Sequence, residues 1–345
     1  MTKLSLFIPG LFGPDAAFVS DYVPELPALS TLLCRGRGVA SGVESESVYR
    51  TLYRLLGFPL PTDADIPVGA VSRRLDVQED STAVWVRADP VHIQADRDGA
   101  IMFDADRFQL DRRDALALAG ELRESFSLLG WELEVPMPGR WYLRLPATAA
   151  VQTVEPDRVS DNDMLQYLPT GPVAGDWHRL INEVQMLLHN SEVNRLREQR
   201  GELPVNSLWL WGGGVQPQPV TSQWDTIYSS DVFVTSLADL SATACHALPD
   251  SVEGMTAEQF DGTVLVYLDA LQDKVQYRDL QGWHDTLLQY EQNWFAPLLK
   301  CLRKKQISEL SLHCGPVIYT VNRMQLRFFW RRRRPFARYV EQAMA

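Results

Sequence analysis

The sequence lacks the features that mark secreted, membrane-spanning or nucleic-acid-binding proteins. Four cysteines are scattered along 345 residues without a C-x-x-C pair, which argues against a disulfide framework or a zinc knuckle. Reduced thiols in a cytoplasmic protein are the simpler interpretation. No run reaches the roughly 18 apolar residues that a membrane span needs. The net charge of −11 also lacks the positive excess expected of a general nucleic-acid binder.

The first apolar run is too short for a secretory signal and is not followed by an A-x-A-like site. It covers Leu4–Ile8, and Pro9 and Gly10 interrupt it, so we expect a buried first strand. The chain contains no internal repeat and no low-complexity tract. Apolar residues make up 46% of the composition, enough for a full core. The length suits two domains, or one large domain with an insertion.

The segment from Asn194 to Gly214 has the clearest local pattern. A polar helix end is followed by Gly201, which can adopt the left-handed conformation that ends a helix, and by Pro204, where a helix cannot continue. The short run Ser207–Trp211 (SLWLW) is apolar and aromatic, and predicts a buried strand. Three glycines follow it. They favour either a ligand-binding edge of an α/β sheet or a tight turn packed on a core, and they match neither G-x-G-x-x-G nor a P-loop.

This segment resembles a block of a known enzyme family. The run P-V-N-S-L-W-L-W-G-G-G, preceded by V-N-R-L-R, is similar to P-A-N-x-I-W-L-W-G-x-G of the archaeal-type cofactor-independent (2,3-bisphosphoglycerate-independent) phosphoglycerate mutases. That family belongs to the alkaline-phosphatase-like superfamily. The resemblance implies an α/β fold with a mostly parallel sheet, flanked by helices and interrupted by a smaller α+β insert domain.

The order of apolar patterns in this chain agrees with that layout. We expect a discontinuous α/β domain formed by residues 1–62 and 171–345, with an insert formed by 63–170. One sheet should contain five segments, namely Leu4–Ile8, Ser207–Trp211, Val232–Thr235, Gly262–Leu268 and Leu310–Leu312. A long amphipathic helix is predicted over about Ala174–Gln199. Met324–Trp330 alternates as an edge strand does.

The resemblance also implies a reaction that this chain is poorly equipped to perform. The family moves a phosphoryl group through a phosphoserine, with two divalent metals held by carboxylates and imidazoles. When the family blocks are laid over this sequence, Pro9, Gln272, Gln276 and Leu312 fall on metal-ligand positions, and only His313 is retained. Ser47 is nearest to the nucleophile position, without the family's S-D-x-A context. The pattern therefore predicts no metal site.

Candidate ligand-binding residues remain around the glycine block and the end of the first strand. Asn194 and Arg197 lie one helical turn apart and match an N-x-x-R pattern of the family. Arg197 could bind an anion or could tie the helix end to the insert. The expected set is Asn194, Arg197, Asn206, Gly212, Gly213, Gly214 and His313, and its expected ligand is a small phosphorylated or carboxylated molecule bound without metal.

Three functions remain open at this point. The first is a mutase-shaped protein that has lost its metals and acts by binding a ligand or partner or as a regulatory protein, and the sequence favours it. The second is an active phosphotransferase or mutase that uses manganese or zinc in a rearranged site, with donors drawn from Asp15, Asp269, Asp273, Asp279, His284 and His313. The third is an adaptor for nucleic acid or an anionic membrane through the basic run Arg331, Arg332, Arg333 and Arg334, where a solvated basic edge is the simpler account.

Overall fold

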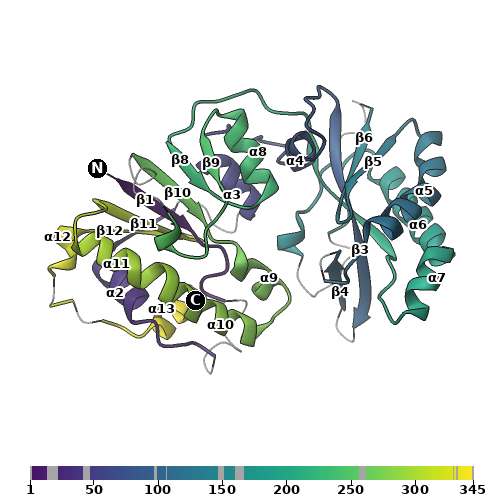
Figure 1. The fold of residues 1–345 in the computed structure, drawn as a ribbon. Coiled ribbons are helices and arrows are strands. Elements are labelled where there is room, and N and C mark those ends of the chain that lie inside the picture. Colours follow the sequence, from purple (N-terminus) through teal and green to yellow (C-terminus); the bar gives the residue numbers. More distant parts are fainter. Residues whose placement is uncertain are drawn as a thin grey trace. The chain divides into compact units, whose positions relative to one another are not determined.

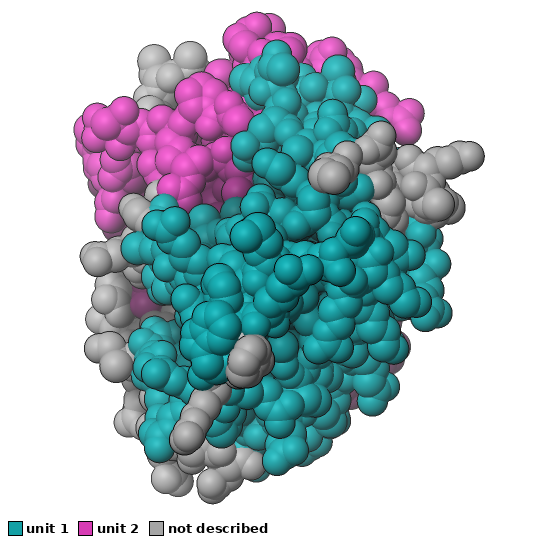
Figure 2. Space-filling view, turned by 90° about the vertical axis from the view of Figure 1, so that its left-hand side faces the viewer, with its two compact units in different colours: residues 1–48, 220–345 teal, residues 49–219 magenta. Residues whose placement is uncertain are grey.

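The computed structural model describes residues 2–13, 22–41, 47–96, 99–105, 107–146, 151–159, 167–255, 262–328, 330–331 and 333–343. The chain forms two compact units (Figure 1, Figure 2). Unit 1 contains residues 1–48 and 220–345, and unit 2 contains residues 49–219. Residues 49–62 and 171–219, expected in the α/β domain, therefore fall in unit 2. Asp15 and Arg332 lie outside the described residues.

Unit 1 is built on a seven-stranded sheet in the order β2-β12-β11-β1-β10-β8-β9. The five strands from β11 to β9 run parallel, whereas β12 and β2 are antiparallel to their neighbours. The α/β class and mostly parallel sheet predicted from the sequence are confirmed. The strands are β1 (Lys3–Phe7), β2 (Arg37–Ala40), β8 (Thr226–Tyr228), β9 (Ala244–His246), β10 (Thr263–Tyr267), β11 (Glu309–Cys314) and β12 (Val317–Asn322).

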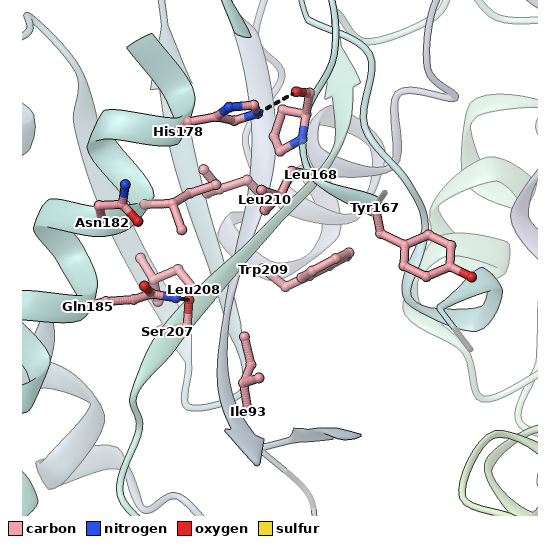
Figure 3. A pocket seen from close by; sticks show the side chains of 12 residues that line it. Ile93, Tyr167, Leu168, His178, Asn182, Gln185, Ser207, Leu208, Trp209 and Leu210 are labelled. Carbon is pink, nitrogen blue, oxygen red and sulfur yellow. Dashed lines mark hydrogen bonds between the residues drawn. The ribbon is translucent and has the colours of Figure 1, made fainter. Parts of the chain in front are cut away.

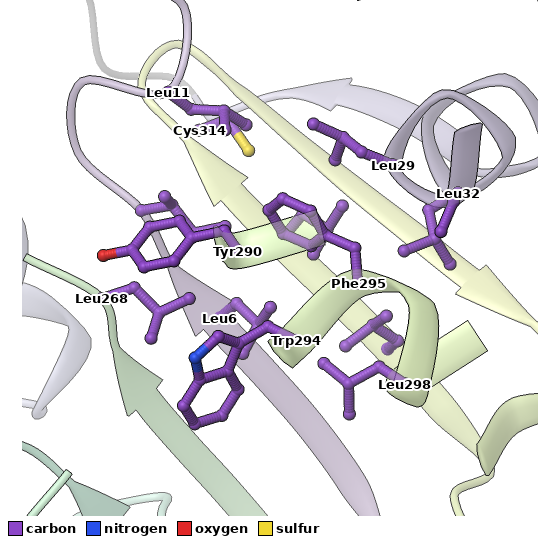
Figure 4. Close-up of a cluster of buried hydrophobic side chains, with 14 of the residues drawn as sticks. Leu6, Leu11, Leu29, Leu32, Leu268, Tyr290, Trp294, Phe295, Leu298 and Cys314 are labelled. Carbon is purple, nitrogen blue, oxygen red and sulfur yellow. The ribbon is translucent and has the colours of Figure 1, made fainter. Parts of the chain in front are cut away.

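Helices cover this sheet because the central strands are apolar on both faces. Leu4 and Leu6 of β1 pack with leucines of α2 and with aromatic residues of the π-helical turn η5 in one large core (Figure 4). The helical segments of unit 1 are α2 (Pro27–Arg35), α8 (Val232–Leu240), η3 (Val252–Gly254), α9 (Ala270–Gln276), α10 (Leu280–Tyr290), η5 (Glu291–Phe295), α11 (Ala296–Arg303), α12 (Arg323–Leu326) and α13 (Phe336–Ala343).

Unit 2 is an α+β unit around the long strand β3 (Val84–Asp96), which pairs antiparallel with β4, β6 and β7. Helices α5 and α6 bury their apolar stripes in the core of this unit together with Leu208 and Leu210. The elements are α3 (Val48–Leu55, its first residue at the unit boundary), α4 (Val68–Val77), β3, β4 (Gly99–Asp104), α5 (Arg112–Leu128), β5 (Glu132–Met137), β6 (Arg140–Leu145), η1 (Pro156–Arg158), α6 (Ala174–His189), α7 (Glu192–Gln199) and β7 (Ser207–Gly214).

The prediction that Ser207–Trp211 joins the sheet of Leu4–Ile8 is wrong. This segment is part of β7, and Trp209 and Trp211 pair with Asp89 and Arg87 of β3 in the sheet of unit 2. A fully apolar strand is buried in either sheet, so its composition does not select its partner.

Three further local predictions are wrong because capping side chains override the apolar pattern. Val232–Thr235 is the start of α8, where the Asp231 carboxylate accepts from the Val234 amide at 2.9 Å. Met324 lies in α12, which Asn322 and Gln325 begin as a capping box. The predicted long helix is two helices, since Ser191 caps α7 at its own amino end.

A buried ion pair joins α7 to α5 in unit 2. The Arg197 side chain is 1% exposed, and its Nη1 lies 3.2 Å from Oδ2 of Asp114. Its other nitrogens donate to the carbonyls of Leu203 at 3.1 Å and Phe108 at 3.0 Å. Groups of unit 2 therefore occupy the donors of the guanidinium. This arrangement matches the structural alternative for Arg197, in which it ties the helix end to the insert.

We expect Arg197→Met to lower the free energy of unfolding by about 3 kcal/mol, because Asp114 and two carbonyls lose a buried donor. Arg195→Met is the matched control: it lies on the same helix, and its pair with Glu192 is exposed, so a much smaller loss is expected. Urea unfolding of both variants measures the difference. Equal losses would contradict an anchoring role for Arg197.

Candidate functional site

The carboxyl ends of the parallel strands in unit 1 meet at one edge of the sheet. The register pairs Phe7 with Tyr267 and with His313, and Val266 with Tyr228. The residues that follow these strands therefore gather at the same edge, where α/β proteins bind ligands. This edge is the place to look for the chemistry that the family resemblance implies.

The four family metal positions carry no anionic donor at this edge. Leu312 is 0% exposed in the core, and Pro9 directly follows Ile8 at the end of β1. Gln272 lies on α9, where its amide oxygen accepts from the Tyr267 hydroxyl at 3.0 Å. Gln276 ends the same helix. Neutral amides and apolar side chains cannot balance two divalent cations, so these residues do not fit the family's metal pair.

Two aspartates do meet at this edge. Asp269 follows β10, and Asp231 follows β8. Burial, together with the charges of Asp231 and Asp273, raises the pKa of Asp269 to about 6. Burial and the nearby Asp269 also raise the pKa of Tyr290, whose hydroxyl accepts from the Ala270 amide at 3.2 Å. Asp231 is not among the predicted donors, because the apolar pattern of Val232–Thr235 predicts a strand; an Asp before V-F-V-T is also a helix N-cap signal.

The other predicted donors have separate contacts. Asp279 caps α10 through the Gly282 amide at 2.9 Å and lies 3.4 Å from the Lys274 ammonium. The Nδ1 atom of His284 lies 2.7 Å from the Tyr22 carbonyl oxygen. In the part of the chain that the structure describes, no group of three or more His, Cys, Asp or Glu side chains is placed to hold a metal ion.

Ser47 and His313 are placed in unit 1. The Ser47 residue is 3% exposed, just before α3. His313 is half-buried on β11, and its backbone carbonyl accepts from the Ile8 amide at 3.1 Å. A catalytic role for Ser47 and a ligand role for His313 stay predictions.

The remaining predicted ligand residues belong to unit 2 and already bond to its backbone. Asn194 is 4% exposed and bridges the carbonyls of Leu188 and Val205 at 2.8 and 2.6 Å. The Asn206 amide pairs with both backbone groups of Ile93, each at 2.8 Å. These amides extend the local backbone ladders, much as Arg197 ties α7 to α5. Ligand binding by these residues stays a prediction.

The glycine block fixes a close approach between β7 and α4. A Cβ on Gly212, where φ is 66°, would lie 2.8 Å from Cβ of Val68, and one on Gly214 would lie 2.8 Å from Cβ of Pro67. The Gly213 amide points to Oδ2 of Asp65 at 3.4 Å. The expectation that these glycines share a sheet edge with Pro9 and Gly10 is wrong, since β7 pairs with β3. The glycines form no turn: they are the end of β7 itself, next to the register shift between Trp85 and Arg87 of β3, and they pack against the start of α4.

Asp269 should make stability fall as pH rises between about pH 4 and pH 6. Its folded pKa lies above the unfolded value, so its neutral form is favoured in the folded state and that contribution is lost as the pH passes the folded pKa. Asp269→Asn cannot ionise, and we expect it to gain up to about 3 kcal/mol at pH 7 relative to wild type. Asp285→Asn, at an exposed position of α10, is the control. Urea unfolding at several pH values would contradict the assignment if both variants follow the wild-type profile.

Comparison with known proteins gives partial sequence matches. A probable 2,3-bisphosphoglycerate-independent phosphoglycerate mutase of Geobacter sulfurreducens is 32% identical over 125 residues, 34% of this chain and 31% of that protein. A 2,3-bisphosphoglycerate-independent phosphoglycerate mutase of Methanosarcina mazei is 26% identical over 132 residues, 36% of this chain and 33% of that protein. The chain thus matches about a third of the length of these curated relatives. No family model matches it.

Solved structures resemble the chain at low identity. A protein of Pyrococcus horikoshii has a TM-score of 0.52 at 11% identity, covering 92% of this chain and 86% of that one, which shows a shared fold. The cofactor-independent phosphoglycerate mutase of Thermoplasma acidophilum has a TM-score of 0.43 at 15% identity, covering 93% and 89%. The sequence matches and the α/β fold confirm the predicted resemblance: over about a third of its length, this chain is similar to 2,3-bisphosphoglycerate-independent phosphoglycerate mutases.

Proposed function

We propose that this phosphoglycerate mutase-like protein has lost two-metal catalysis and acts as a non-catalytic ligand-binding or regulatory protein. One observation carries the proposal: Pro9, Gln272, Gln276 and Leu312 occupy the family's metal positions at the carboxyl edge of unit 1. Two divalent cations need several anionic ligands. The contacts of these side chains are those of packing and of a hydrogen bond to Tyr267.

The ligand we propose is a small phosphorylated or carboxylated molecule, bound without metal. Replacing carboxylates by neutral side chains lowers the negative charge that an anion meets at the edge. The buried Arg197 is a poor charge partner in this arrangement, because its nitrogens already bond to Asp114, Leu203 and Phe108. The half-buried His313, at the edge itself, is the better candidate.

The four cysteines are all free, which supports a reducing compartment such as the cytoplasm.

The alternative is an active metal-dependent mutase or phosphotransferase with a rearranged site and Ser47 as nucleophile. Asp231, Asp269 and Asp273 influence one another electrostatically at the edge, and this grouping favours the alternative. Two observations argue against the alternative. One carboxylate oxygen of Asp231 accepts a hydrogen bond from the Val234 amide, and the Asp269 carboxyl group is partly desolvated. The two proposals differ in metal content and in the fate of the phosphoryl group.

We expect purified protein to contain substoichiometric manganese and zinc and, with added manganese, not to interconvert 3- and 2-phosphoglycerate above background. The four neutral side chains at metal positions are the reason. Mass spectrometry after incubation with substrate should find no phosphoserine. Asp231→Asn/Asp269→Asn should leave the metal content unchanged.

The metal-dependent alternative predicts the opposite result in each of these measurements. It requires bound metal, and the double substitution Asp231→Asn/Asp269→Asn should remove that metal. It also requires turnover at an ordinary enzyme rate, about 1 s⁻¹ or faster, which Ser47→Ala should abolish. That pair of results would end the non-catalytic proposal. Calorimetry with 3-phosphoglycerate on wild type and His313→Ala tests the ligand separately, and an anion that binds both equally would exclude His313 as its partner.

A further inference from the structure

A half-enclosed pocket of about 390 Å³ lies in unit 2, between α6 and β7 (Figure 3). Its floor is the strand segment Ser207–Leu210, and its walls include Ile181 and Gln185 of α6 and the residue Leu168. The volume falls within the range of small-molecule sites in proteins, roughly 300–1,000 Å³. This pocket belongs to one unit and is separate from the carboxyl edge of unit 1.

Apolar side chains supply most of the lining, and Trp209 is held in place. The Trp209 indole nitrogen donates to the Val154 carbonyl at 2.9 Å, which fixes the orientation of the ring at the pocket floor. Leu208 and Leu210 are nearly fully buried beside it. A fixed aromatic ring with aliphatic neighbours suits a flat, apolar ligand.

Two polar side chains converge on the pocket and keep unused hydrogen-bonding capacity. The Gln185 amide nitrogen donates to Oγ of Ser207 at 3.3 Å (Figure 3). Ser207 is 1% exposed, and among the described residues its own proton has no acceptor, nor has the Gln185 amide oxygen a donor. The Ser207 hydroxyl at the floor and the half-buried Gln185 amide oxygen on the wall thus lie side by side, and a buried hydroxyl is stabilised by a partner.

The third polar side chain has a defined tautomer. The Nε2 atom of His178 lies 2.9 Å from the Pro169 carbonyl oxygen, and because a carbonyl only accepts, Nε2 carries a proton. In the neutral ring Nδ1 is then an acceptor. The pocket therefore offers acceptors for a ligand's N–H or O–H group as well as donors, and the amide of Asn182 in the lining adds both kinds.

Charge is missing from the lining. Within the described chain, no Lys, Arg, Asp or Glu lines this pocket. A phosphate or carboxylate would lose its hydration there without gaining a counter-ion, at a large cost in free energy. The chemistry thus selects against the anionic ligands considered for unit 1.

We propose that this pocket binds a small, neutral, largely apolar aromatic molecule that carries one hydrogen-bonding group, held by Gln185 and Ser207 beside Trp209. The ligand class differs from phosphoglycerates, so unit 2 would sense a different kind of molecule from the one proposed for unit 1. The inference rests on the pocket alone, and holds whether or not unit 1 is catalytic.

A matched pair of fluorescent probes tests both the pocket and its charge preference. N-phenyl-1-naphthylamine is neutral and carries one N–H group, and 1-anilinonaphthalene-8-sulfonate adds a sulfonate to the same rings. With the full chain we expect saturable, blue-shifted fluorescence of the neutral probe, and binding of the sulfonate weaker by at least about tenfold. 3-Phosphoglycerate should not displace the neutral probe. No saturable binding of the neutral probe, or equal binding of the two, would overturn the proposal.

Gln185→Trp and Met186→Trp locate the binding. The first places a large ring in the pocket and should weaken the neutral probe at least about tenfold, while the second, on a neighbouring residue of α6 that is 68% exposed, should leave affinity within about twofold. Equal affinity in wild type and Gln185→Trp contradicts the assignment. Photo-crosslinking of wild type with neutral benzophenone gives a result that needs no variant: labels within 178–185 or 207–210 support the pocket, and labels only elsewhere reject it.

Discussion

The antiparallel ladder between β3 and β7 is the constraint on which unit 2 depends. It pairs Val91 with Ser207 and Arg87 with Trp211, and so sets the face of the sheet on which each side chain of the S-L-W-L-W segment lies, with Leu208 and Leu210 in the core beside α6. The strand β3 can do this because it is thirteen residues long and pairs with three other strands. A register shift of one residue would exchange the two faces of β7, and would take Leu208 and Leu210 out of that core.

The sequence predicted features that depend on local pattern, and failed where a distant partner decides. The strands β1, β10 and β11 were predicted because an apolar run bounded by breakers is buried in any sheet. The same reasoning predicts that β7 is a buried strand, but it does not predict which sheet β7 joins. The partner strand β3 lies far earlier in the chain, so no local pattern identifies it. Arg197 is a similar case: its spacing from Asn194 suggested a ligand site, and its true partner, Asp114, lies on a helix much earlier in the chain.

At the carboxyl edge of unit 1, the same electrostatic environment acts on several residues. The positions that the resemblance aligns with metal ligands carry apolar or amide side chains, and Asp231 lies close enough to Asp269 to raise its pKa. A carboxyl group in this setting holds its proton more tightly than one beside a cation. The raised pKa of Asp269 and the hydrogen bond between Gln272 and Tyr267 therefore belong to the same partly desolvated edge.

The insertion of unit 2 into unit 1 has a consequence for how the chain reaches its fold. Lys3 of β1 pairs with Thr263 of β10 and with Glu309 of β11, so the central strand of unit 1 can pair only after strands that are synthesised much later. Closing so long a loop is entropically costly in an unfolded chain. Unit 2 is contiguous and can collapse first, which turns most of that loop into a compact body and shortens the disordered chain left to close. The connectivity therefore favours folding of unit 2 first, because a compact insert lowers the entropic cost of closing the sheet around β1.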